Sequence, residues 1–172
     1  MARLFFALRP DRQVRAEIQT FADALSLESA RLVAAKNTHI TLAFLGSVDE
    51  LTRRCLIKGA SLLRIPPFTL SLDNLGWWRK PKIAWLAPST FPDELSELAA
   101  DLQHLSEDCG LNLEKRPYLP HLTLARKVTS PISSTHVDPI SWNINEFCLL
   151  ESIAGENGVE YQVKVSWPLK IM

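Results

Sequence analysis

The order of hydrophobic and polar residues at the start of the chain predicts a buried strand followed by an amphipathic helix. Residues 4–8 read Leu-Phe-Phe-Ala-Leu and are continuously apolar, as is typical of a core strand. Pro10 suits the first turn of a helix, and after it apolar residues recur at intervals of four, three and four positions, at Val14, Ile18, Phe21 and Leu25. We therefore expect a helix that buries one stripe.

The middle of the chain predicts a second helix and a hairpin. Ser47 and Glu50 have the spacing of a capping box, so a helix is expected to begin there and to run to about Leu63. Residues 68–73 alternate apolar and polar side chains, and residues 82–86 form another apolar run after the turn-forming segment 79–81. These two runs are expected to pair as antiparallel strands.

The remaining pattern predicts a third helix, a loop and a closing hairpin. The helix is expected to begin near Pro92 with Thr90 as its cap and to end near Gly110, with an apolar seam at Leu95, Leu98, Leu102 and Leu105. Residues 128–143 are rich in Ser, Thr and Pro without a clear period, which predicts a surface loop. Residues 146–151 and the strictly alternating run 161–167 flank a Gly-containing turn and predict a hairpin.

One short pattern occurs twice. His39-Ile40-Thr41-Leu42 and His121-Leu122-Thr123-Leu124 are both followed by Ala, and both fall in predicted strands, at about 39–45 and 121–127. Successive side chains of a strand point to opposite faces, so each His shares a face with the Thr two residues later. Each strand therefore presents an imidazole beside a hydroxyl.

The two repeats also divide the chain into similar halves. Each half has an apolar strand, an amphipathic helix and then a His strand, and the two histidines lie 82 residues apart (121 − 39). One half alone would leave one face of its sheet exposed. We therefore expect an α+β fold of two lobes, with the His strands meeting at a groove of pseudo-twofold symmetry and the helices on the outer faces.

Composition narrows the class of protein. The chain has 172 residues, of which 47% are hydrophobic, enough to bury the core of one domain. Its 19 basic and 19 acidic residues cancel, so an anionic partner must be held by local charge. The cysteines are Cys55, Cys109 and Cys148; their odd number and lack of CxxC spacing argue against a disulfide framework and a zinc site. No signal peptide or membrane-spanning segment is recognised, and a cytoplasmic location is expected.

The repeated residues suit acid–base chemistry on a phosphate. An imidazole gives and takes protons near neutral pH, so of two in one groove one can act as base and the other as acid. The hydroxyls of Thr41 and Thr123 can donate to non-bridging phosphate oxygens. A metal centre would need more ligands than two His supply, and no serine lies in a GxSxG elbow. Taken singly, such a His is more often an ordinary strand residue; the repeat favours function.

Around both repeats the sequence resembles a known family. HITLAFLG preceded by Asn37, and RPYLPHLTLAR around His121, resemble the two motifs of the 2H phosphoesterase superfamily and its RNA 2′,3′-cyclic phosphodiesterase (LigT-like) branch. The resemblance extends over nearly the whole chain and implies one domain, 1–172, of two interleaved lobes with mostly antiparallel sheets around a central groove. It implies opening of a terminal 2′,3′-cyclic phosphate on RNA to a 2′-phosphate, with His39 and His121 catalytic and Thr41 and Thr123 on the phosphate.

Three further residues are weaker candidates for substrate binding. Arg126 resembles a basic residue of the family motif, but simple alternation points it away from His121 unless the strand bulges. Phe44 is a candidate for base stacking, although alternation places it in the core, which is the interpretation we favour. Tyr118 precedes the second motif and is expected at the edge of the groove.

Two other functions remain open at this point. The same groups run in reverse would join RNA ends through a 2′–5′ linkage, and a groove without catalysis would bind RNA ends or cyclic nucleotides. The expected partner in each case is RNA or a cyclic nucleotide, with no cofactor, no metal and no membrane, and the chain is expected to be a monomer. Which His is acid and which is base is left open.

Overall fold

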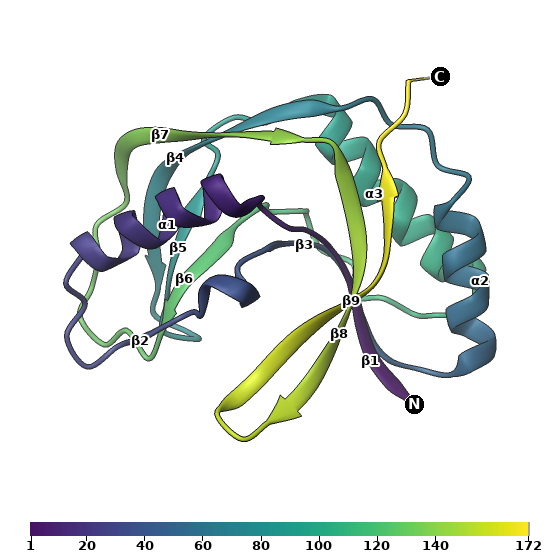
Figure 1. Cartoon of the computed structure of the whole chain (residues 1–172), viewed down its shortest axis with the longest axis horizontal. Coiled ribbons are helices and arrows are strands. Elements are labelled where there is room, and N and C mark those ends of the chain that lie inside the picture. Colours follow the sequence, from purple (N-terminus) through teal and green to yellow (C-terminus); the bar gives the residue numbers. More distant parts are fainter. Residues whose placement is uncertain (172) are drawn as a thin grey trace.

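The computed structural model describes residues 1–171 and contains nine strands, three α-helices and one 3₁₀ helix. In chain order, the elements are β1 (Ala2–Leu8), α1 (Arg12–Ala24), β2 (Arg31–Leu32), η1 (Ala35–Asn37), β3 (Ile40–Val48), α2 (Glu50–Ala60), β4 (Phe68–Trp78), β5 (Ile83–Ala87), α3 (Asp93–Asp108), β6 (Leu122–Arg126), β7 (Thr135–Ile144), β8 (Glu146–Gly155) and β9 (Gly158–Pro168). Figure 1 shows α1 on one side of the molecule and α2 and α3 on the other.

The strands form one hydrogen-bonded sheet in the order β7-β4-β5-β6-β3-β1-β8-β9, with β2 also paired to β6. All of these pairings are antiparallel. The strands that carry the two repeats, β3 and β6, lie at the centre with three strands beyond each, and they meet through one pair, Ile40 and Leu122. The α+β fold of antiparallel strands is thus confirmed. The two expected sheets are continuous at this narrow junction, and the expected pseudo-twofold symmetry stays a prediction.

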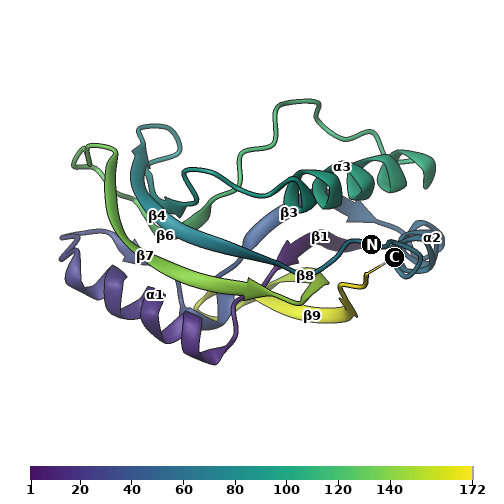
Figure 2. The same cartoon turned by 90° about the horizontal axis from the view of Figure 1, so that it is seen from above.

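The two longer predicted helices cross from one half to the other. The α1 helix follows β1 but packs against β7, and α3 follows β5 but packs against β3 (Figure 2). Their apolar stripes are buried as predicted, with Val14 and Ile18 of α1 and Leu95, Leu98 and Leu102 of α3 inside the main core. Because each helix covers strands of the other half, neither half would bury its apolar surface alone.

The second helix begins later than predicted. Its N-cap is Asp49, whose carboxylate accepts a hydrogen bond from the Thr52 amide, whereas Ser47 belongs to β3. The helix ends at Ala60 instead of Leu63. The cap of α3 also differs, because Pro92 occupies that position and makes no side-chain cap, while Thr90 lies outside the helix. Asp at an N-cap competes well with Ser, so the sequence offered two suitable caps two residues apart.

The predicted loop at 128–143 is wrong in its second half. Residues 135–144 form β7, which pairs with β4. Its apolar alternation is confined to Ile140, Trp142 and Ile144, all buried, while the earlier residues of the strand are mostly exposed. Pro139 is accommodated because β7 is the outermost strand of its side of the sheet, where a missing backbone N–H costs little.

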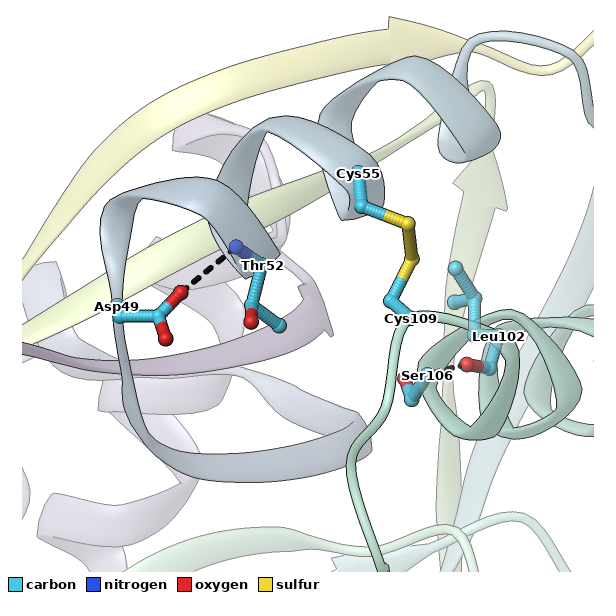
Figure 3. Close-up of a disulfide and its surroundings, with 6 residues drawn as sticks. All are labelled: Asp49, Thr52, Cys55, Leu102, Ser106 and Cys109. Atoms are coloured by element: carbon cyan, nitrogen blue, oxygen red, sulfur yellow. Dashed lines mark hydrogen bonds between the residues drawn. A yellow bond between two sulfur atoms is a disulfide. The ribbon is translucent and has the colours of Figure 1, made fainter.

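The expectation against a disulfide is also wrong, because Cys55 of α2 is bonded to Cys109 at the end of α3 (Figure 3). Gly59 of α2 explains how the helices come this close, since a Cβ there would lie 2.1 Å from a methyl of Leu105. The pairing leaves Cys148 as a buried free thiol. Sequence spacing could not show this, because 54 residues separate the two cysteines.

Candidate active site

The antiparallel pairing of β3 and β6 brings the two His-x-Thr repeats together. Ile40 pairs with Leu122, so the register places the positions of His39 and Thr123 opposite each other, and those of Thr41 and His121. Ile40 and Leu122 are fully buried on the core face. The His and Thr side chains alternate with them and are half-buried on the other face. The predicted convergence of these four side chains on one face is thus what the fold produces.

The backbone holds both imidazoles in the same way. Nδ1 of His39 lies 2.7 Å from the carbonyl oxygen of Asn37, and Nδ1 of His121 lies 2.9 Å from that of Leu119, two residues earlier in each case. A carbonyl only accepts, so each Nδ1 carries a hydrogen and donates it. In a neutral ring this leaves Nε2 as the acceptor, and Nε2 of His39 lies 3.1 Å from Oγ1 of Thr41.

The surroundings of His39 favour its neutral form. The pKa of His39 is lowered to about 4, mainly by burial and to a smaller extent by the neighbouring Arg126, His121 and Arg9, against the raising effect of the hydrogen bond to the Asn37 carbonyl. These groups come from β6, the second repeat and the segment after β1, and among the causes of the shift that the described residues supply none is a carboxylate. The site is therefore electropositive although the chain has no net charge.

Aromatic rings that sequence reasoning did not place in the site flank both histidines. The His39 ring lies 5.0 Å from that of Phe5 on β1 and 5.1 Å from that of Tyr161 on β9, and the His121 ring lies 4.6 Å from that of Trp78 on β4. Trp78 in turn packs against Trp85. Tyr161 belonged to the alternating run that indicated a strand, whereas Trp78 lay between the two predicted strands 68–73 and 82–86; nothing in their spacing pointed to the repeats.

Two β-bulges bring the residues five positions after each His to the site face. Against β1, Thr41 pairs with Ala7 and Ala43 with Phe6, so Leu42 is an extra residue; against β5, Thr123 pairs with Trp85 and Ala125 with Ala84, so Leu124 is extra. After each extra Leu, the side chains that point to the site face are therefore those one position later than simple alternation predicts. Arg126 consequently lines the same cavity as His39 and Thr123, which is the outcome that its candidate role required.

Phe44 holds the equivalent position on the other strand. It is 52% exposed, so the prediction that it packs in the core is wrong. It pairs with Phe5, which contacts His39, and the guanidinium of Arg3 lies 5.2 Å from the centre of its ring. Phe44 was misplaced because simple alternation ignores the bulge, whereas for Arg126 the sequence-based expectation already made a bulge the condition of its role.

Tyr118 does not lie free at the groove edge as predicted. Its hydroxyl donates a hydrogen bond of 3.0 Å to the backbone carbonyl of Thr41, its ring packs on the main core, and burial raises its pKa. The residue ties the segment before His121 to the strand after His39. We therefore assign it a positioning role instead of substrate binding.

A cavity of about 690 Å³ opens beside His39 and Thr123. One wall is the segment 31–37, and the other is the tip of the β8–β9 hairpin from Gly155 to Tyr161. Within residues 1–171, no three His, Cys, Asp or Glu side chains are grouped so that they could hold a metal ion. Over the same residues, no helix is both long and apolar enough to span a membrane.

Comparison with known proteins identifies the family. Residues 10–156 match the model of the 2′-5′ RNA ligase superfamily. The chain belongs to the 2′-5′ RNA ligase superfamily.

Curated relatives match nearly the whole chain. It is 33% identical to the RNA 2′,3′-cyclic phosphodiesterase of Escherichia coli (strain K12) over 97% of this chain and 96% of the relative. It is 27% identical to the RNA 2′,3′-cyclic phosphodiesterase of Methanocaldococcus jannaschii over 96% of this chain and 99% of the relative. Structures of E. coli LigT in the apo form and complexed with 3′-AMP each superpose with a TM-score of 0.89 at 33% identity, over 98% of both chains. The chain therefore has the fold of E. coli LigT over nearly its whole length.

Proposed function

We propose that this protein hydrolyses the 2′,3′-cyclic phosphate at the end of RNA and leaves a 2′-phosphate. The observation that carries the proposal is the placement of His39, Thr41, His121 and Thr123 on one face by the β3–β6 register. The full-length relatives named RNA 2′,3′-cyclic phosphodiesterase support the choice of substrate.

The reaction is an in-line attack of water on phosphorus. Nε2 of one imidazole takes a proton from the attacking water, while Nε2–H of the other gives a proton to O3′ as the P–O3′ bond breaks. The products are a 2′-phosphomonoester and a 3′-hydroxyl, so atoms and protons balance. The Thr41 and Thr123 hydroxyls donate to the non-bridging oxygens, where negative charge builds up.

The electrostatics of the site support an anionic substrate. In the free protein His39 is neutral at pH 7, because its pKa is lowered to about 4 by burial and by neighbouring positive charges. A bound phosphodiester brings a negative charge that raises this pKa, so substrate binding itself prepares the imidazoles for proton transfer. Arg126 adds positive charge from the side of the cavity.

The bulges bring Phe44 and Arg126, which follow the repeats, to the face where substrate would bind. We assign Arg126 to a substrate phosphate and Phe44 to stacking on a base, because each lies on the site face and is exposed. Both assignments depend on the bulged register.

The test is hydrolysis of a 2′,3′-cyclic nucleotide by the purified protein in excess EDTA, followed by phosphorus NMR. We expect the cyclic phosphate signal to be replaced by that of a 2′-phosphomonoester. Binding without turnover would favour the non-catalytic alternative, and turnover only without EDTA would contradict the metal-independent mechanism. Either result would overturn the proposal as stated.

Ligation in the same site is the second candidate, and the superfamily match favours it. The 5′-hydroxyl of a second RNA would replace water as the nucleophile, and the product would contain a 2′–5′ linkage. An RNA with a 5′-hydroxyl, supplied together with the cyclic-phosphate strand, would reveal it as a product of greater length that resists a 3′–5′-specific nuclease.

A further inference from the structure

The cavity beside His39 is larger than one phosphate group requires. Its volume of about 690 Å³ falls in the range of sites that hold whole small molecules, roughly 300–1,000 Å³. Of the four side chains of the two repeats, His39 and Thr123 contribute to its lining. The rest of the cavity extends away from the reacting phosphate, and the mechanism above does not use it.

The far wall is fixed by specific contacts with the hairpin tip. The Asn37 side-chain amide donates to the Val159 carbonyl at 2.8 Å and accepts from the Tyr161 amide at 3.1 Å. Lys36 forms an ion pair of 3.4 Å with Glu160. The cavity is thus a built feature of the fold.

Two arginines lie side by side in the lining of this cavity. Arg31 of β2 and Arg126 of β6 are direct partners in the antiparallel register, and both line the cavity. Like charges placed directly opposite each other destabilise a strand pair. Within residues 1–171 neither arginine forms an ion pair with a carboxylate, although Glu156 and Glu160 also line the cavity. Glu160 is paired with Lys36.

The contacts of Arg31 leave most of its donors available. Nη2 donates to the Asn157 carbonyl at 2.7 Å, and a guanidinium has five N–H donors. Gly158 has a φ of +111° and allows this close approach, because a Cβ there would lie 2.7 Å from Nη2. The hairpin tip therefore orients the guanidinium through a neutral acceptor and leaves its charge unbalanced.

We propose that Arg31 and Arg126 together bind a second phosphate, the internucleotide phosphate on the 5′ side of the terminal ribose. This inference rests on the proposed function and specifies its substrate as an RNA chain in preference to a cyclic mononucleotide. An anion between the two guanidiniums would remove their repulsion, and guanidinium pairs suit the fork geometry of phosphate oxygens. The cyclic phosphate lies at the two repeats, and the next phosphate lies in the cavity beside them.

The experiment compares three substrates of increasing length with the intact protein. They are a 2′,3′-cyclic mononucleotide, the same nucleotide with a 5′-phosphate, and a dinucleotide that ends in a 2′,3′-cyclic phosphate. We expect kcat/KM to rise when the 5′-phosphate is added. We expect Arg31→Gln to lower kcat/KM about tenfold for the two longer substrates and to leave the mononucleotide within about twofold. For the dinucleotide, a plot of log kcat/KM against log salt concentration should be shallower in Arg31→Gln than in the wild type, by a slope of about 0.7.

Two controls separate this proposal from a structural role and from the proposed function. Arg54→Gln removes an exposed arginine of α2 outside the cavity and should change none of the three rates. If Arg31→Gln lowers all three rates equally, Arg31 only holds the hairpin, and the inference is wrong. Equal wild-type rates on all three substrates would also overturn it while leaving the function intact, whereas no hydrolysis of any substrate would contradict the function itself.

Discussion

His39 and His121 are held identically by the backbone, yet they lie in different surroundings. Each donates Nδ1–H to the carbonyl two residues earlier, and each is followed by a bulge at the Leu three positions later. His39, however, lies between Phe5 and Tyr161 with its Nε2 on Thr41, whereas His121 has Trp78 beside it. The repeat therefore gives both imidazoles the same backbone hydrogen bond, while the neighbouring strands give them different aromatic contacts.

This difference is useful for a reaction that needs one base and one acid. Two imidazoles in identical surroundings would favour the same protonation state, whereas unequal surroundings allow one to act as the base and the other as the acid. The neutral form of His39 in the free protein follows mainly from its burial, with Phe5 of β1 and Tyr161 of β9 beside its ring, whereas the ring beside His121 is that of Trp78 on β4. The comparison predicts that both histidines are essential, and that the lowered pKa of His39 makes the stability of the fold depend on pH.

The largest effect should come from removing either imidazole. Positioned acid–base groups typically contribute about 10²–10⁴-fold, so His39→Ala and His121→Ala should each lower kcat by at least about 100-fold. The double variant should lose little more than the worse single variant, because the two groups act in one step. Rapid-quench or NMR assays of hydrolysis would measure this, with His104→Ala on α3 as the matched control. Near-normal turnover by both single variants would contradict the mechanism.

The next effect concerns stability on the helical side of the molecule. The Cys55–Cys109 bond closes a long loop between α2 and α3, and its loss should lower the free energy of unfolding by about 2–4 kcal/mol. The bond does not contact either histidine, so the Cys55→Ser variant should keep its turnover at 25 °C. Urea unfolding with and without reductant measures the change, and Cys148→Ala serves as a cysteine control outside the disulfide. An unchanged midpoint on reduction would show that the bond does not form in solution.

How far the sequence could predict this site follows from the same comparison. Strand periodicity correctly paired His39 with Thr41 and His121 with Thr123, because both pairs precede the bulges. Phe44 was misplaced because it follows a bulge, which no local pattern reveals, and for Arg126 alternation alone pointed the wrong way. The contacts of Tyr161, Trp78 and Cys55 depend on strands and helices distant in sequence, so only the tertiary structure could supply them.

A third test uses the depressed pKa of His39. The unfolded chain binds a proton at His39 near pH 6.5, whereas the folded protein does so only near pH 4. Between these values the unfolded state binds more protons, so stability falls as the pH is lowered from 6.5 towards 4. One pKa unit corresponds to about 1.4 kcal/mol, so the contribution of His39 between about pH 7.5 and pH 5 should be up to about 2 kcal/mol.

The measurement is urea unfolding at both pH values for wild type and His39→Gln. The variant should lose most of this pH dependence, whereas His104→Gln, at an exposed position of α3, should retain it. A proton titration of the His39 ring by NMR would report the same pKa directly. A titration of His39 near pH 6.5 would show that burial does not lower its pKa.

The smallest effect tests the link between the two halves. The Tyr118 hydroxyl, three residues before His121, donates to the carbonyl of Thr41, two residues after His39. Tyr118→Phe keeps the ring in the core but leaves that carbonyl without this donor, which should cost about 1–2 kcal/mol of stability. Because the bond positions one repeat relative to the other, we expect kcat to fall a few-fold with KM nearly unchanged. A raised KM with unchanged kcat and stability would instead indicate that Tyr118 contacts substrate.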